Sequence, residues 1–168
     1  MNDMNEKEII ICVGLPGAGK TTFAKQWVAE DPKNRFRFNS DELLKMMTEG
    51  VYTKESYLTI RDMQSGFIKG ITTNGKSCIL DNTHMNPVVL NDLLMFLDIE
   101  IEDYTKDKYN IIIKDFTNIS KEECIRRDSL RDKPIGESII SYMYDNMDKV
   151  KQIIEQFASF NIIKVEKI

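Results

Sequence analysis

The chain has 168 residues, a length typical of one domain with a substantial buried core. Its formal net charge of −4 argues against a broad electrostatic affinity for nucleic acid, although a local basic pocket is compatible with it. No apolar run approaches the length of a membrane span, and residues 1–7 are polar and acidic, unlike a secretory signal. These features predict a soluble, intracellular protein with no membrane partner.

The most specific motif lies in residues 14–21, which match the phosphate-binding pattern G-x-x-x-x-G-K-S/T. An Ile- and Val-rich run at 8–13 precedes it and predicts a buried strand, and a helical pattern at 20–30 follows it. This order of strand, loop and helix is the context that the motif requires. Glycines let the backbone approach a ligand closely, so that successive N–H groups can point at phosphate oxygens.

The loop predicts a nucleoside triphosphate ligand, ATP or another, together with Mg²⁺. Lys20 would reach the β and γ phosphates, and the Thr21 hydroxyl would ligate Mg²⁺. The helix that starts here adds the positive end of its dipole. The predicted nucleotide-binding residues of the loop are Gly14, Leu15, Pro16, Gly17, Ala18, Gly19, Lys20, Thr21 and Thr22.

The rest of the chain alternates strand and helix patterns. Residues 35–39 alternate with period two and predict a strand, and Asn39 with Glu42 three residues later predicts a helix start. The charged stretch 100–108 is interpreted as a solvated helix end and loop. The other expected elements are a helix at 54–73, a strand at 77–80, a helix from Pro87, a strand at 110–116, a helix after Ser120, a long helix at 136–160 and a strand at 162–166.

Alternation of buried strands with helices predicts an α/β fold, a parallel sheet of about five strands with helices on both faces. In such a sheet, ligands bind beyond the carboxyl ends of the strands. Gly14, Asn39, Asp81 and Phe116 each close a predicted strand at that edge. We therefore expect their loops to converge on one site.

Two acidic residues at this edge are candidates for chemistry. Asp41 follows the second strand near a helix start and could act as a base on an acceptor hydroxyl, or it could be a first-turn acid that stabilises the helix dipole. Asp81 ends an apolar run, as does the acidic residue that holds Mg²⁺ in many nucleotidases. Its alternative role is hydrogen bonding within the loop at 82–84.

The cysteines and the single histidine do not predict a metal site. Cys12, Cys78 and Cys124 lack metal-ligand spacing and are interpreted as small buried side chains. His84 cannot form a histidine-rich metal site by itself.

The densest basic cluster comprises Arg126, Arg127, Arg131 and Lys133. Arg127 and Arg131 are four residues apart and share a face while the helix lasts. Their guanidinium groups could clamp the β and γ phosphates as a lid at about 126–134. The alternative is a solvated basic helix end that complements its own dipole.

Together, these segments resemble the 5′-hydroxyl polynucleotide kinase domain of phage and animal end-healing enzymes. The matching segments are residues 14–21, 39–41, 81–84, 126–131, 134–135 and 141–143. The resemblance covers nearly the whole chain and implies a P-loop NTPase fold of the nucleoside-kinase type, with one kinase domain at 1–168 and no phosphatase domain. It also implies a cytoplasmic location, in the host cell if a phage encodes the protein.

Carried over residue by residue, the resemblance implies a division of roles. Lys20 would bind the phosphates and Thr21 the metal, and Asp41 would be the general base on the 5′-hydroxyl end of DNA or RNA. Arg131 would be the lid arginine on the donor phosphates, with Arg127 as a second candidate.

One departure from the family concerns the acceptor. The family has an arginine before the aspartate and another three residues after it, where this chain has Ser40 and Leu44. Lys45 or Arg61 could supply the missing cation. The change leaves the kinase chemistry intact and weakens the acceptor assignment.

Three functions remain compatible with the sequence. The first is ATP-dependent phosphorylation of a polynucleotide 5′-hydroxyl. The second is a kinase of the same fold that acts on a nucleoside, sugar or antibiotic, which Leu44 makes more plausible. The third is a nucleotide-dependent switch module, against which the base and lid candidates argue. The helix expected at 136–160 could cover the core or also meet a second copy of the chain.

Overall fold

The computed structural model of the chain describes residues 6–104 and 109–168, without the side chains of residues 101–104. The interpretation of residues 100–108 as a solvated helix end and loop therefore lies largely outside the described residues. The strands are β1 (Lys7–Val13), β2 (Arg35–Phe38), β3 (Ser77–Leu80), β4 (Tyr109–Asp115) and β5 (Lys164–Lys167). The helices are α1 (Lys20–Glu30), α2 (Ser40–Thr48), α3 (Lys54–Thr73), α4 (Pro87–Tyr104), α5 (Lys121–Ser129), α6 (Glu137–Asp145) and α7 (Met147–Ser159).

The strands form one sheet in the order β2-β3-β1-β4-β5, and every pairing is parallel. The central strand β1 sets Ile10 opposite Ile79 of β3 and Ile112 of β4. All three residues are buried, as expected for a parallel strand covered on both faces. The five-stranded parallel sheet predicted from the sequence is confirmed.

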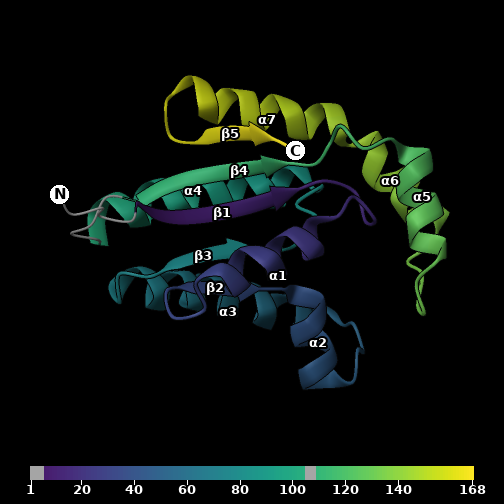
Figure 1. The fold of residues 1–168 in the computed structure, drawn as a ribbon, viewed down its shortest axis with the longest axis horizontal. Coiled ribbons are helices and arrows are strands. Elements are labelled where there is room, and N and C mark those ends of the chain that lie inside the picture. The colour runs from purple at the N-terminus through teal and green to yellow at the C-terminus, as the bar shows by residue number, and fades with distance from the viewer. Residues whose placement is uncertain (1–5, 105–108) are drawn as a thin grey trace.

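Helices cover the two faces of the sheet. Figure 1 shows α1 in front of the strands, with α3 and α4 behind them. On α4, Leu90, Leu94 and Leu97 lie at helical spacing and are fully buried, so this helix turns one apolar stripe to the core. None of the described helices is long and apolar enough to cross a membrane.

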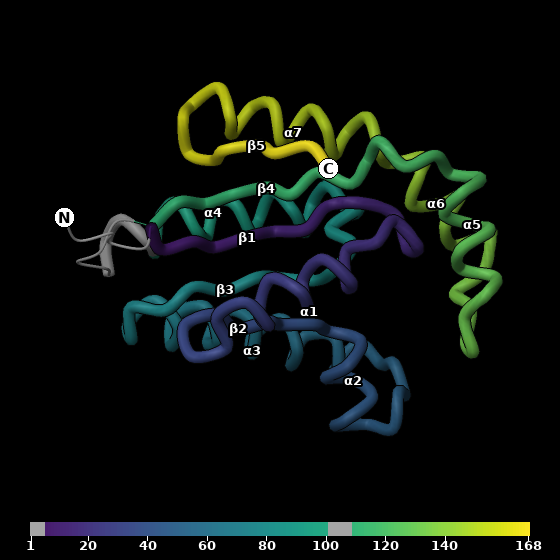
Figure 2. The backbone as a smooth tube through the Cα atoms, viewed as in Figure 1, coloured from purple at the N-terminus to yellow at the C-terminus, as the bar shows by residue number. Residues whose placement is uncertain are grey.

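The prediction of one long helix at 136–160 is wrong. The chain forms α6 and α7, which are separated at Asn146. The backbone N–H of Asn146 bonds to the carbonyls of Met143 and Tyr144 and so ends α6 with a tightened turn. The two helices then pack on different partners, α6 on α5 and α7 on α4 and β5, and their separate courses are visible in Figure 2.

The boundaries of four strands also differ from the prediction, by one or two residues. β2 ends at Phe38, because Asn39 is the N-cap of α2 and its side chain accepts the N–H of Glu42. The last strand begins at Lys164, two residues later than expected.

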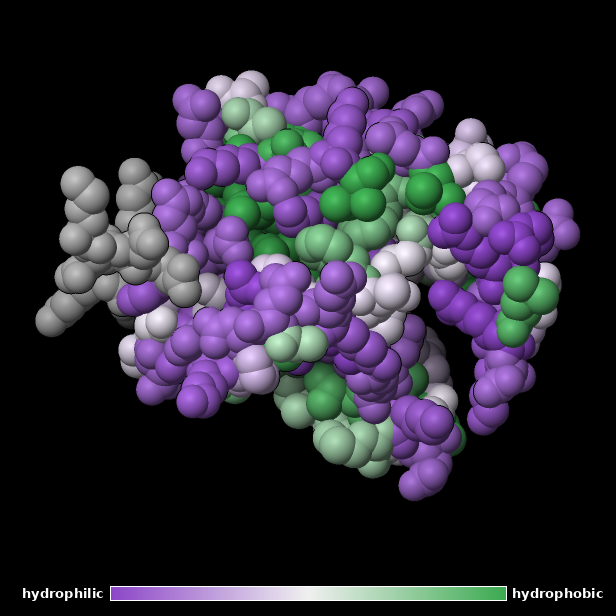
Figure 3. All heavy atoms as spheres, viewed as in Figure 1, coloured by the Kyte–Doolittle hydropathy of each residue, from purple (hydrophilic) through white to green (hydrophobic). Residues whose placement is uncertain are grey.

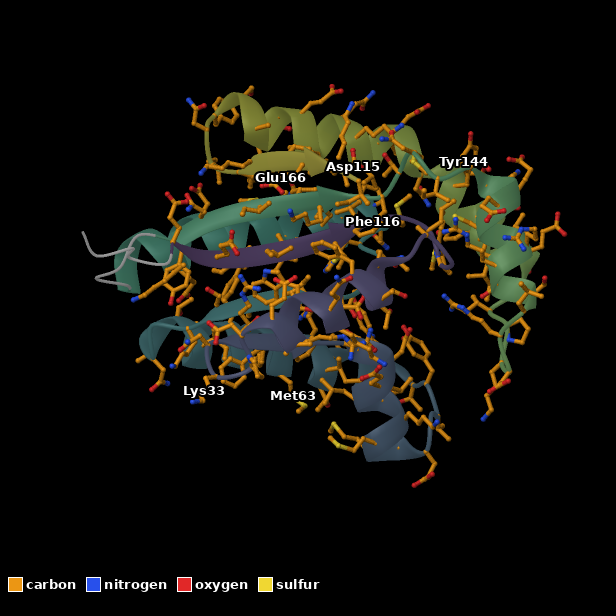
Figure 4. The ribbon with its side chains drawn as sticks, viewed as in Figure 1. Lys33, Met63, Asp115, Phe116, Tyr144 and Glu166 are labelled. Carbon is orange, nitrogen blue, oxygen red and sulfur yellow. The ribbon has the colours of Figure 1, made fainter. Side chains whose placement is uncertain are left out.

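The carboxyl ends of the strands are joined by backbone hydrogen bonds. The N–H of Gly14 bonds to the carbonyl of Thr83 at 3.0 Å, and the N–H of Asp81 bonds to that of Phe38 at 2.8 Å. Phe116, which Figure 4 labels beside Asp115 at the end of β4, donates its N–H to Val13 at 2.8 Å. The four loops expected at this edge therefore do converge there.

His84 fixes the loop after β3 to β1. Its ring lies in the core, and Nδ1 is 2.7 Å from the carbonyl of Cys12, so Nδ1 carries the proton that it donates. Nε2 is buried and has no hydrogen-bond partner among the described residues. Burial lowers the pKa of His84 to about 4, chiefly because water is excluded from the ring.

This burial predicts a loss of stability in acid. The unfolded chain protonates His84 near pH 6.5, whereas the folded chain keeps it neutral down to about pH 4. The contribution is complete above pH 6.5 and falls by roughly 3 kcal/mol as the pH approaches 4. Urea unfolding at pH 7 and pH 4.5 should show a smaller loss for His84→Gln than for the wild type. Equal losses in the two proteins would contradict this account.

Candidate active site

The loop at residues 14–19 bends so that the start of α1 is open to a ligand. Gly17 and Gly19 have φ of 85° and 102°, in the left-handed region that favours glycine. Gly19 is the N-cap of α1, and within this described helix no side chain caps the first turn. The first-turn N–H groups, which have no intrahelical acceptor, can therefore bind an anion.

A cavity of about 250 Å³ lies against this loop. It brings the loop together with two arginines that are distant in sequence, since Gly17 and Arg127 are 110 residues apart. Leu15, Pro16 and Ala18 are buried and do not line the cavity. The lining residues are Gly17, Gly19, Lys20, Thr21, Thr22, Arg127 and Arg131.

Lys20 lies inside the loop as a buried ammonium group. Its Nζ donates to the carbonyl of Leu15 at 2.6 Å. Burial lowers the pKa of Lys20 to about 8, and the nearby Asp81 carboxylate opposes this shift. A phosphate group would offer this ammonium a charged partner in place of a neutral carbonyl.

Thr21 and Asp81 form the pair predicted to hold Mg²⁺. The Thr21 hydroxyl donates to Oδ1 of Asp81 at 3.2 Å, and Asp81 is only 1% exposed. In the described part of the chain, no group of three or more His, Cys, Asp or Glu side chains could hold a metal ion. A hydroxyl and one carboxylate fit Mg²⁺ bound to a nucleotide, because this ion takes few protein ligands and completes its shell with phosphate and water.

Asp41 does not line the cavity. It is exposed in the first turn of α2, a helix joined to the loop after β3. The N–H of Ser40 donates to Oδ1 of Asn82 at 2.9 Å, and Nδ2 of Asn39 donates to the carbonyl of Asp81 at 2.5 Å. These bonds fix the helix that carries Asp41 beside the metal pair.

The three positions considered for binding the acceptor phosphate differ in how far their side chains are buried. Leu44 is partly buried and packs against the hydrophobic core. Lys45 on α2 and Arg61 on α3 are both exposed. An apolar contact thus takes the place where the kinase family has an arginine.

Arg127 and Arg131 approach the cavity from an arm formed by α5, residues 130–136 and α6, which Figure 1 shows at the carboxyl end of the sheet. Arg127 donates through Nε to Glu123 at 2.6 Å and through Nη1 to the carbonyl of Gly17 at 3.4 Å. Arg131 lies beyond the end of α5, and its Nη1 is 3.5 Å from Oδ1 of Asp128. The helix therefore ends before Arg131, yet both arginines reach the same cavity.

Figure 3 shows the arm as a mainly hydrophilic projection, separated by an open hollow from the part of the molecule that contains α2. Tyr144, labelled in Figure 4, lies on its α6 side. The arm and α2 therefore flank a space open to solvent.

Sequence reasoning missed two residues of this region. Asp128 is buried and accepts the N–H of Gly136 at 2.9 Å, which closes the loop that carries Arg131. Arg37 bonds to Asp81, the candidate metal ligand. Arg37 was one polar residue in an alternating strand, and only its charge hinted at a partner.

The fold and the loop define a kinase-like P-loop protein that binds nucleotides. Residues 9–98, which are 90 of the 168 residues, match the family described as an AAA domain. The chain belongs to this family.

Solved structures share the fold. The structure of the Pnkp1/Rnl/Hen1 RNA repair complex contains a chain with a TM-score of 0.70 and 22% identity, in a match that covers 93% of this chain and 48% of that one. A second structure of the Pnkp1/Rnl/Hen1 complex gives a TM-score of 0.61 and 24% identity over 75% of this chain and 40% of that one. This chain thus spans about half of the RNA repair chain, or less.

A chain from the PezAT chromosomal toxin-antitoxin system of Streptococcus pneumoniae is also similar, with a TM-score of 0.64 and 13% identity. The match covers 99% of this chain and 70% of that one. At these identities, the similarities show a shared fold.

Gly17 offers a test of how the loop packs on the arm. A Cβ at Gly17 would lie 2.6 Å from the carbonyl oxygen of Cys124 in α5, whereas a Cβ at Gly50 would meet nothing within 4 Å. Both residues have a φ near 85°. Gly50→Ala should therefore cost only backbone strain, about 1 to 2 kcal/mol. Gly17→Ala adds a steric clash and should cost about 2 to 5 kcal/mol in total.

Denaturant unfolding measures both losses, and ATP titration measures binding. We expect weaker ATP binding for Gly17→Ala alone. Equal losses in stability and unchanged ATP affinity for the two variants would contradict the close packing of the loop on α5.

Proposed function

We propose that the chain transfers the γ-phosphoryl group of ATP to the 5′-hydroxyl end of DNA or RNA. The observation that carries this proposal is the cavity that unites Lys20 with Arg127 and Arg131. A loop that only holds a nucleotide does not need two further arginines, whereas phosphoryl transfer needs cations around the group that moves. The interpretation of residues 1–168 as one kinase domain with a lid at 126–134 belongs to the same proposal.

The donor side of this reaction is mainly electrostatic. Lys20 and the first-turn N–H groups of α1 bind the phosphates from the loop side of the cavity. Arg127 and Arg131 bind them from the side of the arm. Release of Arg127 from Glu123 would free its Nε for a phosphate oxygen. Mg²⁺ held by Thr21 and Asp81 would neutralise charge on the phosphate oxygens.

The acceptor side is assigned to α2. Asp41 takes the proton of the 5′-hydroxyl as its oxygen forms a bond to the γ phosphorus, the bond to the β-phosphate oxygen breaks, and ADP leaves. Asp41 is exposed and accessible to a large acceptor end. The polynucleotide assignment is supported by the sequence segments shared with 5′-hydroxyl kinases, and the similar chain in an RNA repair complex agrees with it.

A kinase for a small hydroxyl compound, such as a nucleoside, sugar or antibiotic, is the alternative. Leu44 favours it, because this partly buried side chain cannot grip an acceptor phosphate as an arginine does. A homo-oligomer is compatible with either function.

The acceptor is tested by supplying ATP labelled at the γ phosphate together with 5′-hydroxyl oligonucleotides of DNA or RNA, nucleosides, 3′-phosphorylated mononucleotides, or no acceptor. We expect label on the oligonucleotides. Label on small molecules and never on oligonucleotides would overturn the proposal in favour of the alternative.

Asp41→Asn keeps the size of the side chain and removes the base. The turnover number should fall by about 10²- to 10⁴-fold, while ATP affinity stays unchanged. Asp62→Asn, on an exposed acid of α3, is the matched control and should retain wild-type turnover. Full transfer by Asp41→Asn would show that another group is the base.

A further inference from the structure

Arg37 lies on the edge strand β2 of the sheet, and its guanidinium group is largely buried. Its side chain is 13% exposed, and Nε donates to Oδ2 of Asp81 at 2.8 Å. Nη2 lies 2.6 Å from the same oxygen. Asp81 therefore uses Oδ2 for Arg37, with a longer bond from Nδ2 of Asn39 at 3.3 Å, and keeps Oδ1 for Thr21.

The other edge of the same guanidinium group binds α2. Nη1 and Nη2 of Arg37 donate to the two carboxylate oxygens of Glu42 at 2.8 and 2.9 Å. The hydrogen bonds from Arg37 hold the pKa of Glu42 below its usual range. One planar group thus bridges two carboxylates that belong to different parts of the chain.

These two carboxylates belong to the two halves of the candidate site. Asp81 pairs with Thr21 at the metal position, and Glu42 directly follows Asp41 in the first turn of α2. The bond from Asn39 to the Asp81 carbonyl lies beside the same bridge. Arg37 therefore joins the metal half to the acceptor half by charge and lies closer to Glu42 than does Lys25 of α1, whose Nζ is 3.7 Å from Oε1 of Glu42.

We propose, resting on the function proposed above, that Arg37 is a positioning residue of the phosphotransfer site. It fixes the orientation of the Asp81 carboxylate so that Oδ1 faces Thr21, and it holds the first turn of α2 against that carboxylate. Asp41 is thereby kept at a constant separation from the nucleotide loop.

The bridge between Asp81 and Glu42 requires hydrogen-bond donors along two edges of one group, and a positive charge alone does not provide them. A guanidinium group presents donors along two edges of one plane, whereas a lysine ammonium is a compact charge on a flexible stem. The buried Asp81 carboxylate also needs a compensating cation. Arg37→Lys therefore keeps the charge and loses the bridge, and Arg37→Gln loses both.

The test compares four variants of the full chain. Arg37→Gln and Arg37→Lys change the bridge, and Glu42→Gln weakens its α2 end together with the exposed ion pair of Glu42 with Lys25. Arg35→Gln is the matched control, because Arg35 lies two residues earlier on the same strand face. Its guanidinium group donates to Glu30 and stacks over the Trp27 ring instead. The measurements are ATP affinity with and without Mg²⁺ by calorimetry, kcat and KM for transfer, and the melting temperature.

Adding Mg²⁺ increases the ATP affinity of the wild type by a certain factor. We expect this factor to be about 10- to 100-fold smaller in Arg37→Gln, and kcat to fall by a similar amount. Arg37→Lys should lie between this variant and the wild type. Glu42→Gln should keep the Mg²⁺ gain, because Asp81 retains Arg37, and should lower kcat through α2. Arg35→Gln should change the melting temperature alone.

A wild-type Mg²⁺ gain and kcat in Arg37→Gln would overturn the inference, and so would equal effects of Arg37→Gln and Arg35→Gln. If Arg37→Gln does not fold, Arg37→Lys and Glu42→Gln decide, and wild-type values in both would overturn it. The proposed function fails separately. Absence of label on oligonucleotides, with the Mg²⁺ gain still lost in Arg37→Gln, overturns the acceptor and supports the role of Arg37 at Asp81.

Discussion

The buried carboxylate of Asp81 is the group on which the geometry of the site depends. Asp81 follows β3 in the sheet interior, and its carboxylate accepts hydrogen bonds from Thr21 on α1, from Arg37 on β2 and from Asn39 at the start of α2. A buried charge of this kind is tolerated only with such partners. Because each partner comes from a different element, satisfying one carboxylate also aligns the nucleotide loop with α2.

On the side of the arm, the nucleotide loop is in close backbone contact with α5. Gly17 approaches the carbonyl of Cys124 on α5 so closely that a side chain would not fit, and Arg127 reaches back to the carbonyl of Gly17. The loop is therefore held between the charged hydrogen-bond network of Asp81 and an arm of exposed arginines. In the function that we propose, the network would keep the metal and acceptor groups in place while the arm adjusts to the bound phosphates.

The nucleotide loop could be predicted because its chemistry is local. A glycine at 17 or 19 is required by the backbone conformation of those same positions, and Asn39 caps a helix that begins one residue later. The break at Asn146 could not be predicted in this way. Apolar spacing continues from α6 into α7, and the packing of the two helices on different partners is not visible in that spacing.

The role of Arg37 could not be predicted from the sequence for another reason. Its partner Asp81 is 44 residues away, and their contact requires β2 and β3 to be neighbours, with Phe38 opposite Leu80. An alternating strand at 35–39 predicts which residues share a face and does not predict which charge lies opposite them. The role of Asp128, which closes the loop that carries Arg131 from within α5, could not be predicted for the same reason, because it depends on tertiary packing.

The central claim is that Asp81 couples the nucleotide loop to the metal. The most direct measurement is the ATP affinity of Asp81→Asn with and without Mg²⁺, since asparagine keeps the shape of the side chain and one accepting oxygen and removes the charge. The account predicts that ATP binding without Mg²⁺ is at least as tight as in the wild type, because a negative charge near the phosphates is gone, and that the gain on adding Mg²⁺ is lost. A gain equal to that of the wild type would contradict it.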